Sequence, residues 1–138
     1  SEFFYYQESS AWKYVLKYVA IDFYDGSIMY DFANGKTTIC DIDLFHKQPC
    51  VNDIGRMWGS SRFQSPEEYQ LGADIDEITN VYTLGATAFA LFGEYNRIRE
   101  KWQLNDKLFE IATRAVSDDR ANRQQTIKQF TAEWEAAQ

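Results

Sequence analysis

Carboxylates at the ends of apolar stretches are the residues of this sequence best suited to chemistry. Asp22 follows Val-Ala-Ile, whereas Asp41 and Asp43 follow Thr-Thr-Ile-Cys. Phosphoryl transfer uses such residues, because an aspartate orients the attacking hydroxyl and acidic ligands hold the Mg²⁺ that bridges the phosphates. Each aspartate alone is a weak signal, since most aspartates are solvated and a strand often ends in a polar turn.

Two cysteines and the single histidine form a second group with chemical potential. Cys40 and Cys50 are separated by nine residues, and His46 lies between them. A metal site is one interpretation, but Cys40 in an apolar strand pattern is more typical of a small buried hydrophobic residue. Two cysteines do not make a disulfide framework, and reduced cysteines fit the cytoplasm, which is the predicted location.

Composition indicates one folded domain over residues 1–138. Ten Phe, nine Tyr and four Trp can supply a core in a chain of this size. The net charge of −7 argues against nucleic acid as a partner and weakly against an anionic membrane. No apolar run approaches the roughly 20 residues that a membrane span needs.

The first half of the chain predicts one helix and one hairpin. Helical spacing of apolar residues predicts a helix over residues 9–20. Strands at 27–32 and 36–41 flank Asn34-Gly35, a strong hairpin signal. Residues 43–65 show little periodicity and are expected to be a loop, long enough to suggest a functional segment.

The second half predicts helices. Ser65 and Pro66 are typical of a short helix start, with Glu67 and Glu68 in its first turn. A buried helix is expected over residues 76–92, ended by Gly93, and amphipathic helices over 104–116 and 122–136. The sequence therefore predicts a mainly α domain with one small β-hairpin.

Three segments in order strengthen this picture. They are Gly-Ser-Ser-Arg-Phe-Gln-Ser-Pro-Glu at 59–67, Asn-Val-Tyr-Thr-Leu-Gly at 80–85 and Asp-Asp-Arg-Ala-Asn-Arg at 118–123. They resemble the end of the activation segment, the central buried helix and the late arginine of the protein kinase C-terminal lobe. The chain thus resembles that lobe of a divergent, bacterial-type serine/threonine kinase-like protein.

This resemblance implies roles for individual residues. Asp22 corresponds to the catalytic aspartate, and Ser27 and Asp41 correspond to the ligands of Mg²⁺. Glu67 is expected to form a partly buried ion pair with Arg123. Replacing Arg120, in the same turn, with alanine is expected to cost no more stability than a surface substitution.

Departures from the kinase pattern leave the activity open. Ala20 and Ile21 stand in place of the His and Arg before the catalytic aspartate, and Tyr24 and Ser27 stand in place of the loop lysine and the loop asparagine. Asp43 replaces the glycine after the metal aspartate, and Asn80 replaces the aspartate of the buried helix. The alternatives are an active serine/threonine kinase, a small-molecule phosphotransferase of aminoglycoside type, and a pseudokinase that binds a protein. An unrelated helical adaptor is a further interpretation.

The resemblance does not extend to an N-terminal lobe. The sequence has no Gly-x-Gly-x-x-Gly loop to cover the phosphates of ATP. We expect a missing lobe or a second protein chain, including a second copy, as the partner, and the aromatic stretch 3–6 would suit such a contact. ATP and Mg²⁺ are implied for the full-length protein, whereas this chain alone is expected to bind neither tightly and to be inactive.

Overall fold

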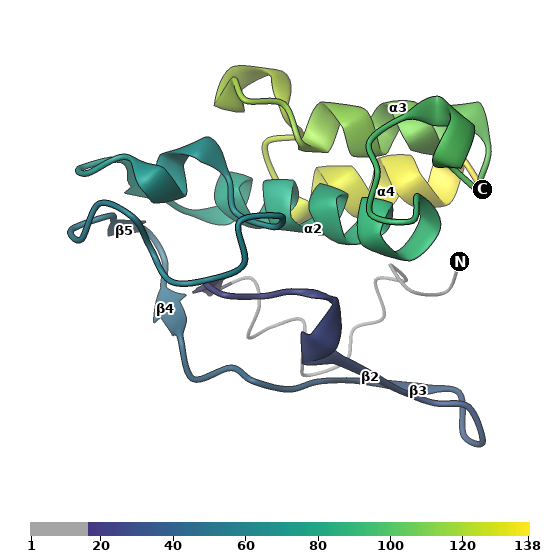
Figure 1. Ribbon diagram of the computed structural model, residues 1–138, viewed down its shortest axis with the longest axis horizontal. Coiled ribbons are helices and arrows are strands. Elements are labelled where there is room, and N and C mark those ends of the chain that lie inside the picture. The colour runs from purple at the N-terminus through teal and green to yellow at the C-terminus, as the bar shows by residue number, and fades with distance from the viewer. Residues whose placement is uncertain (1–16) are drawn as a thin grey trace.

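The computed structural model describes residues 17–138, in which short paired strands are followed by helices (Figure 1). The strands are β1 (Tyr18–Ala20), β2 (Ile28–Asp31), β3 (Lys36–Ile39), β4 (Phe45–Lys47), β5 (Cys50–Val51) and β6 (Asp74–Ile75). The α-helices are α2 (Glu77–Phe92), α3 (Asp106–Ala115) and α4 (Ile127–Ala136). The 3-10 turns are η2 (Asp25–Ser27), η3 (Pro66–Tyr69), η4 (Arg99–Lys101) and η5 (Arg120–Asn122).

The predicted hairpin is confirmed as β2–β3. Its antiparallel register places Asp31 opposite Lys36. The Asp31 carboxylate accepts hydrogen bonds from the backbone N–H of Ala33 at 2.9 Å and of Asn34 at 3.3 Å, and Gly35 takes a φ of 63°. Aspartate bonding and left-handed glycine are the local chemistry of tight turns, so this hairpin is set by its own turn residues.

Two further antiparallel pairs correct the expectation of a single hairpin. Within the described residues, β1 also pairs with β4, and β5 pairs with β6. Residues 18–20, expected to end a helix, are therefore strand, and the loop expected over 43–65 contains β4 and β5. These strands have only two or three residues, too few to show alternation in a sequence. The remainder of that predicted helix, at 9–16, and the aromatic stretch 3–6 lie outside the described residues.

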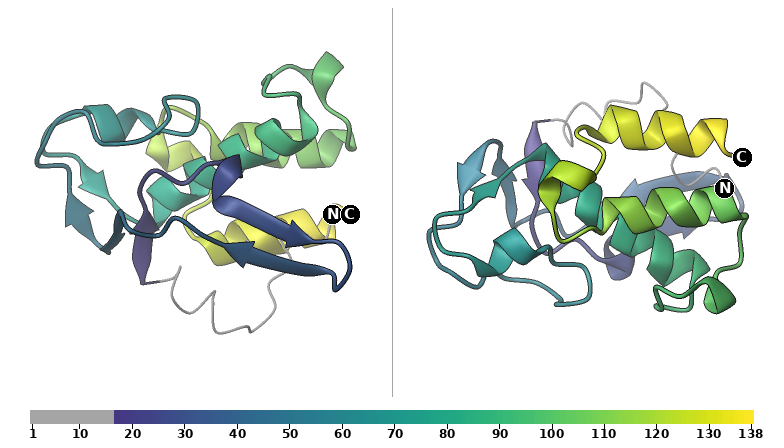
Figure 2. Two further views of the ribbon diagram at one scale, coloured as in Figure 1. Left: turned by 60° about the horizontal axis from the view of Figure 1, so that its bottom comes forward. Right: turned by 90° about the horizontal axis from the view of Figure 1, so that it is seen from above.

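Helix α2 confirms the prediction for residues 76–92. Asp76 caps it by accepting a hydrogen bond from the backbone N–H of Ile78 at 2.9 Å, and Gly93 ends it. Most of its side chains are buried, because α3 and α4 pack against one side while β1 and η2 contact the other. Figure 2 shows α3 and α4 running side by side against α2.

The last two helices are close to their predicted bounds. Helix α3 falls within 104–116, but α4 begins at Ile127, five residues after the predicted start at 122. Residues 120–122 form η5 instead, and Thr126 caps α4 by accepting from the backbone N–H of Gln129 at 2.9 Å. Trp102 and Trp134 are core residues.

A second, smaller core supports the strands. Val19 and Ile21 pack with Met57 and Ile75, so residues from β1, the long loop and β6 meet there. None of the helices between residues 17 and 138 is long and apolar enough to cross a membrane.

Candidate functional site

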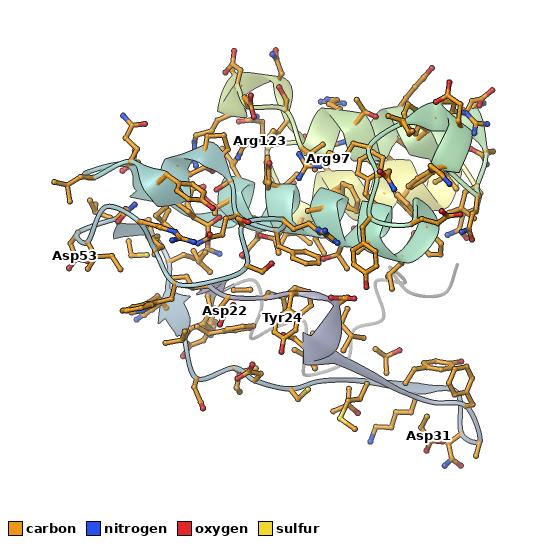
Figure 3. All side chains as sticks on the ribbon, in the orientation of Figure 1. Asp22, Tyr24, Asp31, Asp53, Arg97 and Arg123 are labelled. Carbon is orange, nitrogen blue, oxygen red and sulfur yellow. The ribbon has the colours of Figure 1, made fainter. Side chains whose placement is uncertain are left out.

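Asp22 lies in the bend that connects β1 to η2. Its backbone is left-handed, with a φ of 59°, and Asp41 after β3 has the same value. Such a conformation is uncommon outside glycine, and aspartate is one of the side chains that tolerate it. Both aspartates that the kinase resemblance singles out therefore have a left-handed backbone, and Asp22 lies in a turn. In Figure 3, Asp22 and Tyr24 lie below the helices, whereas Arg123 lies among them.

A small pocket adjoins Asp22. Its polar lining comes from Asp22, Ser60, Gln64, Glu68 and Thr83, with Ala20, Phe23 and Phe63 as apolar walls. The pocket therefore brings together residues from the β1–η2 bend, from the segment 60–68 and from α2.

Gly59 of the loop lies close to Asp22. A Cβ atom at Gly59 would lie 3.3 Å from both the Cα and the Oδ1 of Asp22, and the φ of Gly59 is 138°. A side chain at this position would crowd the aspartate and strain the backbone. Glycine at position 59 thus allows the loop to lie directly on Asp22.

Asn80 of α2 fixes the strand that precedes Asp22. Its Nδ2 donates to the carbonyl of Tyr18 at 2.9 Å, and its Oδ1 accepts from the backbone N–H of Ala20, also at 2.9 Å. An amide carries both a donor and an acceptor, so it satisfies both backbone groups of β1, which an ionised carboxylate could not do. Asn80 positions the backbone that leads to Asp22.

Ser27 is fully buried at the end of η2. Its Oγ accepts a hydrogen bond from the backbone N–H of Tyr24 at 3.4 Å, and its carbonyl accepts from the backbone N–H of Cys40 at 2.9 Å. The second bond ties the start of β2 to the residue before Asp41. The hydroxyl predicted to bind a metal thus already caps a turn.

Asp41 is exposed, as are its neighbours Ile42 and Asp43. No group of three or more His, Cys, Asp and Glu side chains within residues 17–138 is placed to hold a metal ion. Mg²⁺ is usually held by one or two carboxylates together with substrate phosphates and water. Asp41 fits an ion that arrives with phosphates, and the described residues offer no cage for a resident metal. The positions of these side chains also give no support to a metal site at Cys40, His46 and Cys50, and both cysteines are free thiols.

The expected pair of Glu67 and Arg123 is confirmed. Arg123 Nη1 lies 2.7 Å from Glu67 Oε1, and Nη2 lies 3.0 Å from Oε2, so the contact is bidentate. Arg123 is 0% exposed and Glu67 is 4% exposed. Burial by itself raises the pKa of Glu67, but the hydrogen bonds and charge of Arg123, with the charge of Arg120, outweigh it and lower the pKa below its ordinary value. The pair joins residues that are 56 positions apart.

Arg120 also joins this site, although the sequence singled out Arg123 alone. Its Nη1 donates to Glu67 Oε1 at 2.8 Å, and its Nη2 contacts both oxygens of Asp76, at 2.8 and 2.7 Å. The 3-10 turn η5 explains the difference, because it brings Arg120 and Arg123 to the same carboxylate. The turn therefore supplies two cations to one buried anion.

Glu68 is a buried site residue that the sequence argument placed only in a helix turn. Its Oε2 accepts hydrogen bonds from the backbone N–H of Ser65 at 2.6 Å and from Ser65 Oγ at 2.9 Å. Burial raises its pKa to about 7. The spacing Ser65-x-x-Glu68 is that of a capping box, which is the signal that could have identified this contact.

Trp58 does not anchor the loop that connects β5 to η3. The side chain of Trp58 is 68% exposed. Gln64 holds the loop instead, because its Nε2 donates to the carbonyls of Met57 at 2.8 Å and Trp58 at 3.2 Å. The exposed indole remains available for a partner.

A comparison with protein-family models finds no match, and neither does one with curated proteins. The class of this protein must therefore be argued from its own fold and site.

Proposed function

We propose that this chain is the C-terminal lobe of a kinase-like ATP-dependent phosphotransferase, of serine/threonine protein kinase type, and that it is inactive alone. The buried pair of Glu67 and Arg123 is the observation that carries this proposal. It was expected from the kinase resemblance, and it is a specific contact between segments far apart in the chain. An unrelated helical domain would have no reason to bury this pair at these positions.

The surroundings of Asp22 support the same function. The aspartate lies at a sharp bend, its preceding strand is held by Asn80, and Gly59 lets the loop approach it closely. Asp22 orients the acceptor hydroxyl and accepts its proton, which is the role of a positioned general base. When bound, Mg²⁺ and ATP supply the phosphoryl group, and Asp41 is the carboxylate that would hold the ion.

The proposal requires a partner for this lobe. Kinases hold ATP between two lobes, so the other wall of the nucleotide site comes from an N-terminal lobe of the same protein or from a second chain, including a second copy. Without that wall, the charges that stabilise the transition state are incomplete, and we expect no phosphate transfer by the 138-residue chain.

The test is phosphate transfer from ATP by the protein encoded by the complete reading frame. We expect Asp22→Asn to lower the rate by about 10²–10⁴, the usual contribution of a general base. Asp53→Asn, an exposed carboxylate outside the pocket, is the matched control and should leave the rate unchanged. Assays against protein serine and threonine and against hydroxylated aminoglycosides separate the two substrate classes. Full transfer by Asp22→Asn would contradict the proposal.

A pseudokinase that binds a protein is the second candidate, and the state of Ser27 favours it. Its hydroxyl is buried in the η2 turn, where it caps a backbone N–H rather than meeting solvent. For this candidate we expect no transfer and no effect of Asp41→Ala on nucleotide binding in the full-length protein. Binding of Mg²⁺ with ATP that Asp41→Ala weakens would favour the phosphotransferase instead.

A further inference from the structure

Glu67 and Glu68 are neighbouring carboxylates that the fold treats in opposite ways. Both are 4% exposed. Glu67 accepts hydrogen bonds from two arginines and from Thr79 Oγ1 at 3.0 Å. Glu68 receives hydrogen bonds from Ser65 alone, at a single oxygen, and forms no salt bridge within residues 17–138. One carboxylate is therefore neutralised by cations, whereas its neighbour depends on neutral donors.

This difference gives Glu68 a protonation equilibrium near neutral pH. Burial is the main cause that raises its pKa to about 7, and the negative charge of Glu67 contributes in the same direction. The hydrogen bonds from Ser65 and the charge of Arg123 act in the opposite direction. A buried carboxyl without a paired cation is expected to hold its proton in this way.

Glu68 reaches Asp22 through the pocket and through the backbone. Both side chains line the same small pocket. In addition, the carbonyl of Glu68 accepts a hydrogen bond from the backbone N–H of Met57 at 2.8 Å. Met57 lies two residues before Gly59, which packs on Asp22. A movement of η3 would therefore also move the loop that covers Asp22.

The charges that face Glu68 determine what ionisation would do. Glu67 precedes it in η3 and Arg123 approaches from the segment before α4, and these are the two charges that shift its pKa. Arg123 already forms a bidentate contact with Glu67, and Arg120 acts on that same carboxylate. Loss of the Glu68 proton thus adds a negative charge beside the Glu67 carboxylate, which already engages Arg123. Like charges at close range in a poorly solvated site repel each other.

We propose that Glu68 is a positioning residue whose proton holds the loop 57–60 against Asp22. With neutral Glu68, the Ser65 cap and the contact of Gly59 with Asp22 persist together. With ionised Glu68, repulsion between the Glu67 and Glu68 carboxylates shifts η3, and the loop that is bonded to η3 through Met57 moves away from Asp22. The inference rests on the proposed function only in treating Asp22 as the base, because the contact between Gly59 and Asp22 lies within this chain.

Backbone amide resonances of the 138-residue chain test the proposal without any assay of activity. The Ser65 N–H donates directly to Glu68 and reports its ionisation, whereas the Gly59 N–H reports the loop at Asp22. We expect both resonances to inflect near pH 7, and Glu68→Gln to remove both inflections while the spectrum stays that of a folded protein. Ser65→Ala removes one donor to the ionised form, so the Gly59 inflection should move to higher pH.

His46→Asn is the control, because imidazole is the other group type that titrates in this range and the sequence contains one histidine. This variant should retain both inflections. An inflection at Ser65 without one at Gly59 would show that Glu68 titrates without positioning the loop, and would overturn the proposal. An inflection that survives Glu68→Gln would also overturn it. Should Glu68→Gln not fold, the shift in Ser65→Ala decides. Because no step involves phosphate transfer, failure here leaves the proposed function to its own test.

Discussion

The helices α2, α3 and α4 enclose one continuous core, whereas the β2–β3 hairpin presents most of its side chains to solvent. Phe89, Trp102, Phe130 and Trp134 pack ring against ring inside the helical region. In the hairpin, Met29, Tyr30 and Phe32 are exposed, and Figure 1 shows the hairpin pointing away from the helices.

This contrast teaches where the stability of the domain resides. A two-stranded hairpin by itself is marginal in water, and among the described residues this one is anchored near its base, where Cys40 bonds to the Ser27 carbonyl. The helical region combines apolar packing with the buried Glu67–Arg123 pair. We therefore expect substitutions in the helical region to affect unfolding strongly and those in the hairpin to affect it weakly.

The largest expected effect is that of Arg123→Ala. Removal of the arginine leaves the buried Glu67 carboxylate with only part of its compensation, and breaking a buried pair from one side costs about 3–5 kcal/mol. The free energy of unfolding from urea denaturation measures the loss. Arg114→Ala is the control, since its pair with Glu133 is partly exposed and such pairs contribute about 1 kcal/mol or less. Equal losses in the two variants would contradict a dominant buried pair.

The pH dependence of stability should carry the signature of Glu68. Its pKa is higher in the folded chain than its ordinary value of 4.5, so the folded state keeps the proton that the unfolded state releases. Its stabilisation is complete below pH 4.5 and is lost as pH rises to about 7. The loss amounts to about 3 kcal/mol at 1.36 kcal/mol per pKa unit.

Urea denaturation of the native chain and of Glu68→Gln between pH 4.5 and 8 measures this loss of stability with rising pH. The variant should lack the decline, and parallel curves would contradict the prediction. Glu67 acts in the opposite sense, because its pKa is lowered: its stabilisation is present above 4.5 and is lost as pH falls through the folded value. The two neighbours can therefore be separated by pH.

Gly85→Ala tests the close contact between α2 and α3. An added Cβ would lie 2.7 Å from Ala115 Cβ and 2.9 Å from Val116 Cγ1, so α3 would have to move. We expect the free energy of unfolding to fall by about 1–3 kcal/mol, as for other overpacked cores. This loss is expected although alanine has a higher helix propensity than glycine. Thr113→Ala on the exposed face of α3 is the control and should change stability little. A more stable Gly85→Ala variant would show that the helices can separate at no cost.

Arg120→Ala should lower the free energy of unfolding by about 1–2 kcal/mol, which is less than for Arg123→Ala and more than for Arg114→Ala. The side chain is 28% exposed, so solvent screens its contacts with Glu67 and Asp76. A double-mutant cycle of Arg120→Ala with Asp76→Asn measures the coupling between the two residues. Zero coupling would mean that Arg120 stabilises the fold through partners other than Asp76, such as Glu67 and the carbonyl of Asp74.

Phe32→Ser should have the smallest effect, within about 0.5 kcal/mol, because Phe32 is 88% exposed at the hairpin end. Phe130→Ala in the helical core is the contrasting variant, and it should cost about 3–5 kcal/mol. Thermal or urea unfolding of both variants measures the difference. A large loss for Phe32→Ser would show that the hairpin is covered in solution.

Several features of the fold could be predicted because neighbouring residues decide them. The hairpin follows from Asn34-Gly35, helix α2 from its cap at Asp76 and its end at Gly93, and the η3 turn from Ser65-Pro66. For the site, the resemblance predicted the contact between Glu67 and Arg123. The catalytic role of Asp22 and the metal roles of Asp41 and Ser27 stay predictions.

Other features escaped because distant segments decide them. Strand β1 was expected to be helical, but Asn80, some 60 residues away, bonds both of its backbone ends. Arg120 was expected to matter no more than a surface residue, but the turn η5 directs it to Glu67 and Asp76. The meeting of Glu68 with Asp22 around one pocket also had no local signal.

The sequence by itself therefore determined the turns, the caps, the long helix and which residues carry charge. The tertiary structure decided which of those charges are buried, which are paired and which face one another. The physical reason is that turn and cap chemistry acts over three or four residues, where backbone groups need immediate partners. The energy of a carboxylate depends instead on the water removed from it and the cations brought to it. That is why adjacent glutamates at 67 and 68, alike in the sequence, differ so widely in the folded protein.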